Sequence, residues 1–335
     1  MKTGKMNETS FFEKRENMKT ILVTGGTGFL GANLCHRLIA NGYKVICLDN
    51  NYTGRFEHIA DLTAHPNFEF IKHDVTKKIE INEPIHQIYN LACPASPVAY
   101  QGKHAIDTTK TCVLGAINVL ELAKQHHARI LQTSTSEIYG KPLEHPQTEK
   151  YLGNVNPIGI RACYDEGKRC AESLFFDYHR YEDVEIKVVR IFNTYGPYMN
   201  VDDGRVVSNF IYEALTGKNI TIYGDGLQTR SFCYVDDLID ALVLMMNSDK
   251  DFTGPVNLGN PEECSIKQLA DMIVQKIGGN LKVVYQGLPA DDPIRRKPDI
   301  ALAQSKLNWT PKIKLNEGLD KTIAYFKSVL SSNQK

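Results

Sequence analysis

The segment from Thr20 to Asp49 constrains the fold more than any other part of this 335-residue chain. Residues 20–23 are a short apolar run that leads into a glycine-rich stretch. A stripe of apolar side chains at helical spacing follows, and a second apolar run, residues 44–48, ends at Asp49. A strand, a glycine turn, a helix and a second strand in this order predict a βαβ unit of a parallel sheet.

The glycines of this turn can be aligned in two ways, as Gly26, Gly28 and Gly31 or as Gly25, Gly28 and Gly31. Either alignment lets the backbone approach a pyrophosphate at a helix N-terminus, where free amides favour negative charge. A glycine pattern alone is also typical of a flexible turn, but the flanking strands and helix favour a dinucleotide site. The carboxylate of Asp49 suits a ribose hydroxyl and would repel a 2′-phosphate, so we expect NAD rather than NADP.

Strands and helices continue to alternate along the first half of the chain. The pattern predicts strands at 68–71, 87–92, 129–133 and 185–191, and helices at 105–125 and 162–180. We therefore expect an α/β fold, a Rossmann-type doubly wound parallel sheet whose ligands bind beyond the carboxyl ends of its strands. Residues 135–137 follow one such strand end and residues 193–194 follow another, which places both groups at the predicted site.

The second half of the chain is less regular and predicts a smaller lobe that closes over the sheet edge. Its predicted elements are a helix at 207–216, a strand at 220–223, helices at 265–277 and 316–329, and a segment, 231–235, that rejoins the sheet with a helix from Asp236. The predicted domains are a disordered leader at 1–17, a nucleotide-binding domain at 18–195 that is rejoined by about 229–259, and a C-terminal α/β substrate-binding lobe at 196–228 and 260–330.

The charge balance and the cysteines exclude several classes of partner and location. The chain carries 39 basic and 39 acidic residues, so it has no bulk electrostatic footprint for nucleic acid or an anionic membrane. No apolar run approaches the ~18 residues of a membrane span. The eight cysteines are scattered without a C-x-x-C pair, which is typical of a reducing compartment. The cysteine pattern and the lack of an apolar span together predict a cytoplasmic protein. No histidine is paired with acids at ligand spacing, so no metal site is expected.

Tyr164 and Lys168 lie four residues apart in a predicted helix, so both side chains emerge on one face. A phenol has a pKa of about 10, and an adjacent ammonium favours its ionised form. The pair is therefore a candidate general base that removes a proton from a hydroxyl group. The same spacing is common on solvated helix faces, so the pair gains meaning only beside the dinucleotide site.

Together, the glycine turn, the string 135–140 and the Tyr164/Lys168 pair resemble those of the extended short-chain dehydrogenase/reductases. Within that superfamily, the chain is similar to the UDP-glucuronate decarboxylase (UDP-xylose synthase) family from about residue 18 to residue 330. The similarity rests on strings at 94–97, 156–159, 163–169, 190–194, 203–210 and 296–299.

This resemblance implies an NAD-dependent reaction without net oxidation. Tyr164, as phenolate, takes the proton of the sugar 4-hydroxyl while hydride passes from C4 to NAD+, and Lys168 steadies the phenolate and holds the nicotinamide ribose. The C4 ketone makes the C5 carboxylate a β-keto acid, so CO2 can leave. The enolate is then protonated at C5 and the ketone is reduced again, which yields UDP-xylose. Thr135 and Ser136 are expected to hydrogen-bond the 4-oxygen.

Glu137 is the residue that distinguishes C5 chemistry from simple epimerisation at C4. A carboxylate in a closed pocket can have a raised pKa and exchange protons with C5 or with a water molecule. Its alternative role is that of a strand-end carboxylate with structural hydrogen bonds. Related dehydratases carry an acidic Asp at the position of Ser136, and the absence of that acid argues against a dehydratase.

The resemblance also implies contacts for the remainder of the substrate and the cofactor. Arg296 is expected at the reacting end of the sugar, although residues 295–297 alone could be a solvated basic run. Arg205 and Arg230 suit the UDP diphosphate because a guanidinium forms forked hydrogen bonds. The other expected substrate contacts are Tyr100, Lys110, Asn118, Arg161, Asn193 and Tyr223, the last packed on the uracil. The expected NAD contacts are Gly25, Gly28, Phe29, Leu30, Gly31, Asp49, Asn50, Tyr52, Thr53, Gly54, Asp74, Val75, Leu91, Tyr164, Lys168 and Thr194.

A homodimer formed through the helices near 105–125 and 162–180 is a further implication of the resemblance. Two positions depart from the family pattern, since Cys112 stands where relatives usually have Asn and Ile160 where they usually have Pro. The nearest alternative function is a UDP-sugar 4-epimerase or 4,6-dehydratase. An alternative of another class is a non-catalytic dinucleotide-binding regulator, against which the intact set of Tyr164, Lys168 and Glu137 argues.

Overall fold

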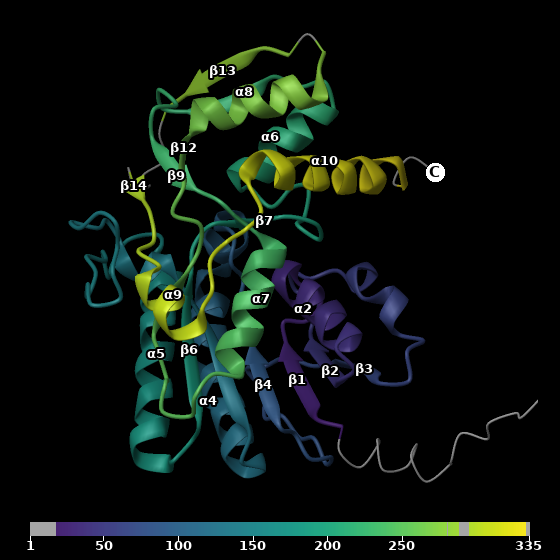
Figure 1. The fold of residues 1–335 in the computed structure, drawn as a ribbon, viewed down its shortest axis with the longest axis vertical. Helices are drawn as coiled ribbons and strands as arrows, with labels where there is room; N and C mark the ends of the chain where they lie inside the picture. Colours follow the sequence, from purple (N-terminus) through teal and green to yellow (C-terminus); the bar gives the residue numbers. More distant parts are fainter. Residues whose placement is uncertain (1–17, 280, 288–294, 333–335) are drawn as a thin grey trace, which may run out of the picture.

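A seven-stranded sheet in the order β11-β6-β5-β4-β1-β2-β3 forms the centre of the molecule (Figure 1). The computed structural model describes residues 18–279, 281–287 and 295–332, and the predicted leader lies outside them. Neighbouring strands in this sheet pair in parallel, which confirms the predicted doubly wound fold. The strands are β1 (Thr20–Thr24), β2 (Lys44–Asp49), β3 (Phe68–Lys72), β4 (Gln87–Asn90), β5 (Arg129–Thr135), β6 (Ile186–Ile191) and β11 (Val256–Leu258).

Helices cover both faces of the sheet because alternate strand side chains point to opposite sides. Ile21 and Val23 pack with α2 (Phe29–Ala40) and α7 (Val235–Met246) in one buried cluster. Leu22, between them, belongs to the other cluster, which contains the buried faces of two long helices. These are α4 (Ala105–His126) and α5 (Ala162–Glu182).

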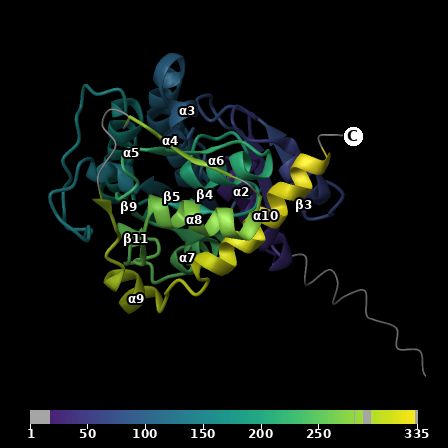
Figure 2. The ribbon, with the colours of Figure 1, turned by 90° about the horizontal axis from the view of Figure 1, so that it is seen from above.

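A C-terminal lobe lies beyond the carboxyl ends of the strands, where α8 and α10 cross in front of the sheet in the view from above (Figure 2). A capping box between Ser265 and Gln268 fixes the start of α8. The helices of the lobe are α6 (Val206–Leu215), α8 (Ile266–Ile277) and α10 (Leu315–Ser332). Its strands are β8 (Ile220–Tyr223) paired with β13 (Val283–Gln286), and β9 (Thr229–Ser231) between β12 (Glu263–Ser265) and β14 (Arg295–Arg296).

One prediction about the return of the chain to the sheet is wrong in detail. Residues 231–235 do not enter the central sheet, because its β6 edge pairs with β11 through Val189 and Val256. The segment instead forms β10 (Cys233–Tyr234), which pairs with β7 (Thr194–Tyr195). The chain returns to the sheet one helix later, through α7 and then β11.

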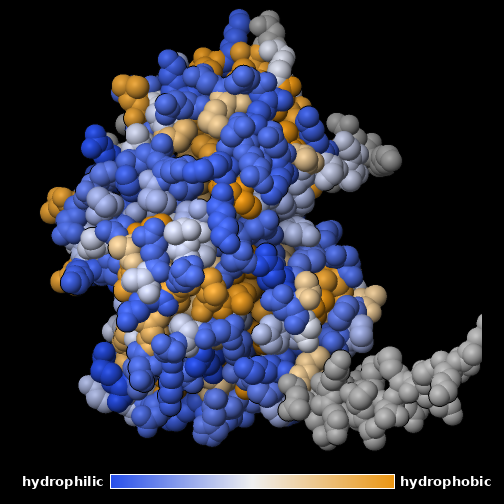
Figure 3. Space-filling model, in the orientation of Figure 1, coloured by the Kyte–Doolittle hydropathy of each residue, from blue (hydrophilic) through white to orange (hydrophobic). Residues whose placement is uncertain are grey.

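Several short elements were not predicted from the pattern of apolar residues. Two of them shape the strand ends, α3 (Pro97–Tyr100) after β4 and η4 (Ser136–Tyr139) after β5. The others are η1 (Phe56–His58), η2 (Ala60–Leu62), η3 (Gly102–His104) and α9 (Ala301–Leu307). Hydrophilic side chains predominate on the face in Figure 3, which is hollowed between the lobe and the sheet. Within the described residues, no helix combines the length and apolarity needed to cross a bilayer.

Candidate active site

A cavity of about 1110 Å³ lies where the strand ends of the sheet meet the C-terminal lobe. Its walls include every residue that the sequence predicted for catalysis and for NAD. All predicted substrate contacts except Asn118 also line it. The amide of Asn118 donates instead to the backbone oxygens of Val75 (2.8 Å) and Lys77 (3.0 Å), so its predicted contact with the sugar is wrong in this structure.

The glycine turn reaches the cavity through Gly25, Gly28 and Gly31. A Cβ atom on Gly31 would lie 2.1 Å from the backbone oxygen of Gly25, and Gly25 has a φ of +72°. Gly26 packs against Cys47, where a Cβ atom would lie 2.3 Å from the sulfur. The alignment of Gly25, Gly28 and Gly31 therefore faces the cavity. The free backbone amides of the first turn of α2 lie beside it. A backbone without side chains at these positions fits a pyrophosphate.

Asp49 is held at the end of β2 with its carboxylate at the cavity wall. One carboxylate oxygen accepts from the amide of Thr27 (3.0 Å) and the other from the amide of Asn51 (2.8 Å). Each oxygen keeps a further lone pair. The side chain is thus oriented in advance and suits a ribose hydroxyl.

Tyr164 and Lys168 are both buried on the cavity side of α5. The Lys168 ammonium donates to the backbone oxygen of Thr133 at 2.9 Å and lies 5.8 Å from the centre of the Tyr164 ring. Burial and the nearby Cys93 thiol raise the pKa of the Tyr164 phenol well above its usual value, while the Thr135 hydroxyl lowers it. Burial therefore outweighs the favourable effect on the phenolate that the sequence predicts for the Lys168 ammonium.

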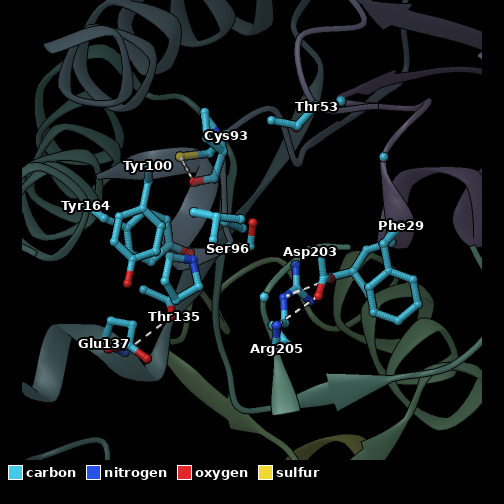
Figure 4. Close-up of a pocket in the computed structure, with 18 of the residues that line it drawn as sticks. Phe29, Thr53, Cys93, Ser96, Tyr100, Thr135, Glu137, Tyr164, Asp203 and Arg205 are labelled. Atoms are coloured by element: carbon cyan, nitrogen blue, oxygen red, sulfur yellow. Dashed lines mark hydrogen bonds and ion pairs between the residues drawn. The ribbon is translucent and has the colours of Figure 1, made fainter. Parts of the chain in front are cut away.

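The ring of Tyr100 stacks on that of Tyr164, with centroids 4.7 Å apart and planes inclined by 10° (Figure 4). Tyr100 comes from α3, which follows the carboxyl end of β4. The Arg161 guanidinium lies 5.9 Å from the centre of the Tyr100 ring. The phenol of Tyr164 is thus fixed by an aromatic neighbour and by the helix that carries it.

Glu137 forms ion pairs with two guanidiniums, those of the buried Arg296 and the partly buried Arg161. Its own amide donates to the Thr135 hydroxyl at 3.2 Å, which fixes the start of η4 (Figure 4). Burial raises the pKa of the Glu137 carboxyl, but the Arg296 and Arg161 guanidiniums together outweigh burial and lower it to about 2. The prediction of a raised pKa is wrong, because the pairing of both guanidiniums with this side chain depends on the fold and not on the spacing of residues in the sequence.

Further cations and an aromatic ring extend the cavity into the lobe. Arg205 lies 3.4 Å from Asp203 through Nε, and its guanidinium is 5.9 Å from the centre of the Phe29 ring (Figure 4). Arg230 on β9 lies in register with Arg296 on β14. The remaining predicted contacts on these walls are Lys110, Asn193 and Tyr223, the last 42% exposed.

Some residues that line the cavity were not predicted, although they lie at or after the carboxyl ends of parallel strands, where ligands of such sheets bind. Cys93 and Ser96 follow the carboxyl end of β4, and Thr133 lies near the end of β5. The unusual Cys112 places its sulfur 3.3 Å from that of Cys93 and packs against Gly167. Ile160 lines the cavity and is 60% exposed.

The eight cysteines are all free thiols. In the part of the chain that the structure describes, no group of three or more His, Cys, Asp or Glu side chains is arranged to hold a metal ion.

Comparison with known proteins places this cavity in a family. The sequence matches the family described as GDP-mannose 4,6 dehydratase over residues 22–322. The chain belongs to this family. It is an NAD-dependent family of extended short-chain dehydrogenase/reductases, as the resemblance implied.

Individual relatives and related solved structures align with nearly the whole chain. UDP-glucuronic acid decarboxylase 6 of Arabidopsis thaliana is 51% identical over 315 residues, which cover 94% of this chain and 90% of the relative. UDP-glucuronic acid decarboxylase 1 of Xenopus tropicalis is 50% identical, with coverage of 95% and 75%. Among solved structures, UDP-glucuronic acid 4-epimerase from Bacillus cereus, in complex with UDP-glucuronic acid and NAD, is 27% identical with a TM-score of 0.83 and coverage of 92% and 99%.

Proposed function

We propose that this protein decarboxylates UDP-glucuronate to UDP-xylose and CO2, with NAD+ bound and regenerated in place. The observation that supports this most strongly is the ion-paired cluster of Arg161, Glu137 and Arg296 in the same cavity as Tyr164 and Lys168. Paired guanidiniums suit a carboxylate on the reacting sugar. Relatives about 50% identical to this chain carry the name UDP-glucuronic acid decarboxylase.

The glycine turn and Asp49 are the residues that would hold NAD. The bare backbone at Gly25, Gly28 and Gly31 accommodates the pyrophosphate, and the fixed carboxylate of Asp49 accepts from the adenosine ribose. The chemistry that NAD supplies when bound is reversible hydride acceptance from the sugar C4. The expected contact of the Asp49 carboxylate with the 2′-hydroxyl of the adenosine ribose favours NAD over NADP, which carries a phosphate there.

The phenol of Tyr164 accepts the proton of the sugar 4-hydroxyl. Thr135 donates toward the same oxygen and lowers the pKa of the phenol, which opposes the effect of burial. Lys168 is held at the end of β5 by the Thr133 oxygen, in reach of a nicotinamide ribose. The stacked ring of Tyr100 keeps the phenol in place and excludes water from one side of it.

Glu137 is ionised in this site because of its two arginine partners. A carboxylate accepts hydrogen bonds and has no proton to give, so its role is to hold Arg161 and Arg296 toward the sugar carboxylate. The proton that reaches C5 after CO2 leaves therefore comes from a water molecule, which Glu137 orients by accepting a hydrogen bond from it. Arg205 and Arg230 bind the diphosphate, and Tyr223 packs on the uracil.

The test is to incubate the protein with UDP-glucuronate and NAD+ and to identify the products by chromatography and mass spectrometry. Release of CO2 in equal amount with UDP-xylose is expected. Accumulation of a UDP-4-keto-pentose would show that the final reduction is slow. Formation of UDP-galacturonate without CO2 would overturn the proposal.

UDP-galacturonate is the product of the second candidate function, that of a UDP-glucuronate 4-epimerase. The structural likeness to the Bacillus cereus 4-epimerase, with a TM-score of 0.83, favours it over a dehydratase. The sequence identity of 27% to that epimerase is well below the 51% to the decarboxylase, so decarboxylation is the better supported function.

We also infer a homodimer that forms through α4 and α5. These helices pack along each other on one face of the sheet and leave an outer side open. Ile106 on α4 and Tyr181 on α5 are 70% and 78% exposed. Exposed apolar side chains on paired helices are typical of a buried interface. The cytoplasmic location stays a prediction from composition.

A further inference from the structure

Asp165 directly follows Tyr164 and is a buried carboxylic acid with no part in the steps above. It is 6% exposed, and among the described residues no donor lies within hydrogen-bond distance of its Oδ1. Its Oδ2 lies 4.0 Å from Nε of Arg161. Arg161 lines the cavity and binds Glu137 through Nη2, whereas Asp165 lies behind it. Asp165 can therefore reach a substrate only through Arg161.

Four charges meet at this end of the cavity, those of the buried Arg296 and Asp165 and of the partly buried Arg161 and Glu137. With both carboxyls ionised the cluster is neutral, and with Asp165 protonated it is positive. Burial and the Glu137 carboxylate raise the pKa of Asp165 to about 7, against the lowering effect of Arg161 and Arg296. Other titratable groups that act on Asp165, or are acted on by it, are Glu166 and Cys163 on α5 and Tyr100 on α3.

We propose that Asp165 is a positioning residue that controls, through Arg161, how tightly the cavity holds the carboxylate of the sugar. This inference rests on the proposed function, because it takes UDP-glucuronate as the ligand. A neutral Asp165 leaves Arg161 to the sugar carboxylate. An ionised Asp165 competes for the same guanidinium at its Nε edge and cancels the positive charge of the cluster.

The sign of the pH dependence follows from this competition. As pH rises through about 7, Asp165 loses its proton and the affinity for UDP-glucuronate falls. UDP-xylose has the same diphosphate but no carboxylate, so its affinity should not follow the ionisation of Asp165. Comparison of the two ligands separates this effect from any pH dependence of the diphosphate site.

The experiment measures binding without turnover, in the NAD-loaded Tyr164→Phe protein. Calorimetric titration at about pH 6 and about pH 8 should give a Kd for UDP-glucuronate that rises about fivefold, or about 1 kcal/mol. Addition of Asp165→Asn should abolish the rise. The matched control is Asp177→Asn farther along the same helix, a partly exposed acid paired with Arg180, which should leave the rise intact.

A fivefold rise that persists after Asp165→Asn, or an equal rise for UDP-xylose, would overturn the role of Asp165. If Asp165→Asn does not fold, Asp165→Ser provides the same titration, since it also removes the charge. The proposed function is tested separately, by measuring CO2 release by the protein that retains Tyr164. Absence of CO2 release would overturn decarboxylation, whereas the titrations test the role of Asp165 by binding alone.

Discussion

Tyr164 and Glu137 line the cavity from different elements and are fixed by different forces. Tyr164 is held by a ring stacked 4.7 Å away, and Glu137 by ion pairs to Arg161 and Arg296. Both sets of contacts are made by the protein's own side chains. The cavity is therefore preorganised, so little reorganisation is required when charge develops on the 4-oxygen.

Replacement of Tyr164 by Phe should reduce turnover of UDP-glucuronate by at least about a hundredfold, because the ring still stacks but accepts no proton. The measurement is the rate of CO2 release at saturating substrate. Tyr178→Phe is the matched control on the same helix, since its hydroxyl binds Glu121 outside the cavity. Equal rates for the two variants would contradict the role of Tyr164, and absence of CO2 release from the wild type as well would favour a regulator.

Glu137→Gln should lower kcat about a hundredfold or more, because a neutral amide no longer holds two guanidiniums toward the sugar. With its pKa at about 2, Glu137 stays ionised from pH 5 to 9, so no inflection of the wild-type rate in this range belongs to it. The pH–rate profile checks this, with Glu144→Gln on an exposed loop as control. An inflection that Glu137→Gln removes would show that the carboxyl titrates.

The same carboxyl predicts how stability changes in acid. Its pKa is about 2 in the folded state and about 4.3 in an unfolded chain. It therefore stabilises the fold above about pH 4.3, and this contribution is lost as pH falls toward 2. Thermal unfolding between pH 5 and 3 should show a steeper loss for the wild type than for Glu137→Gln. Parallel curves would contradict the lowered pKa.

At the scale of elements, the turn between β1 and α2 shows what the sequence predicts well. Its strand, helix and acid are local in sequence, so spacing alone predicted the cofactor turn. The pairing of Arg296 with Glu137 spans 159 residues, and only the approach of β14 to η4 reveals it. The sequence therefore predicted which side chains line the cavity but not which of them pair. It could not predict their protonation, since a pKa depends on neighbours that the fold brings together.

Gly31→Ala tests this turn, because the added Cβ would lie 2.1 Å from the Gly25 oxygen. We expect a loss of about 2 kcal/mol in stability and a smaller rise in Tm on addition of NAD+. Gly287→Ala is the control, as its Cβ would meet no atom of the described residues within 4 Å. An unchanged response of Gly31→Ala to NAD+ in thermal unfolding would show that the turn does not hold the cofactor.

At the scale of the whole molecule, the chain passes from the sheet to the lobe and back before the sheet is complete. The cavity is built from both parts, with Lys168 from α5 and Arg296 from β14 on its walls. The amide of Asn200 also donates to the backbone oxygen of Thr53 at 3.1 Å, which joins the lobe side to the nucleotide side. Neither part alone contains the site.

The proposed dimer belongs to this scale. Ile106→Glu should convert the dimer to a monomer with little loss of Tm, because the side chain is 70% exposed in a single chain. Size-exclusion chromatography with light scattering gives the mass. Leu227→Glu, on an equally exposed residue of the lobe (68%), should leave the dimer intact. A wild-type protein of one-chain mass would contradict the proposal.

The place of β11 at the β6 edge has a consequence for synthesis on the ribosome. β6 ends at Ile191, but its partner strand begins only at Val256, after 64 intervening residues. At about 5–20 residues per second, the ribosome needs about 3 to 13 seconds to make them. During this interval the hydrogen-bonding edge of β6 has no partner strand, and such an edge is a template for pairing with other chains. The nascent protein thus has a period in which a chaperone at this edge would matter most.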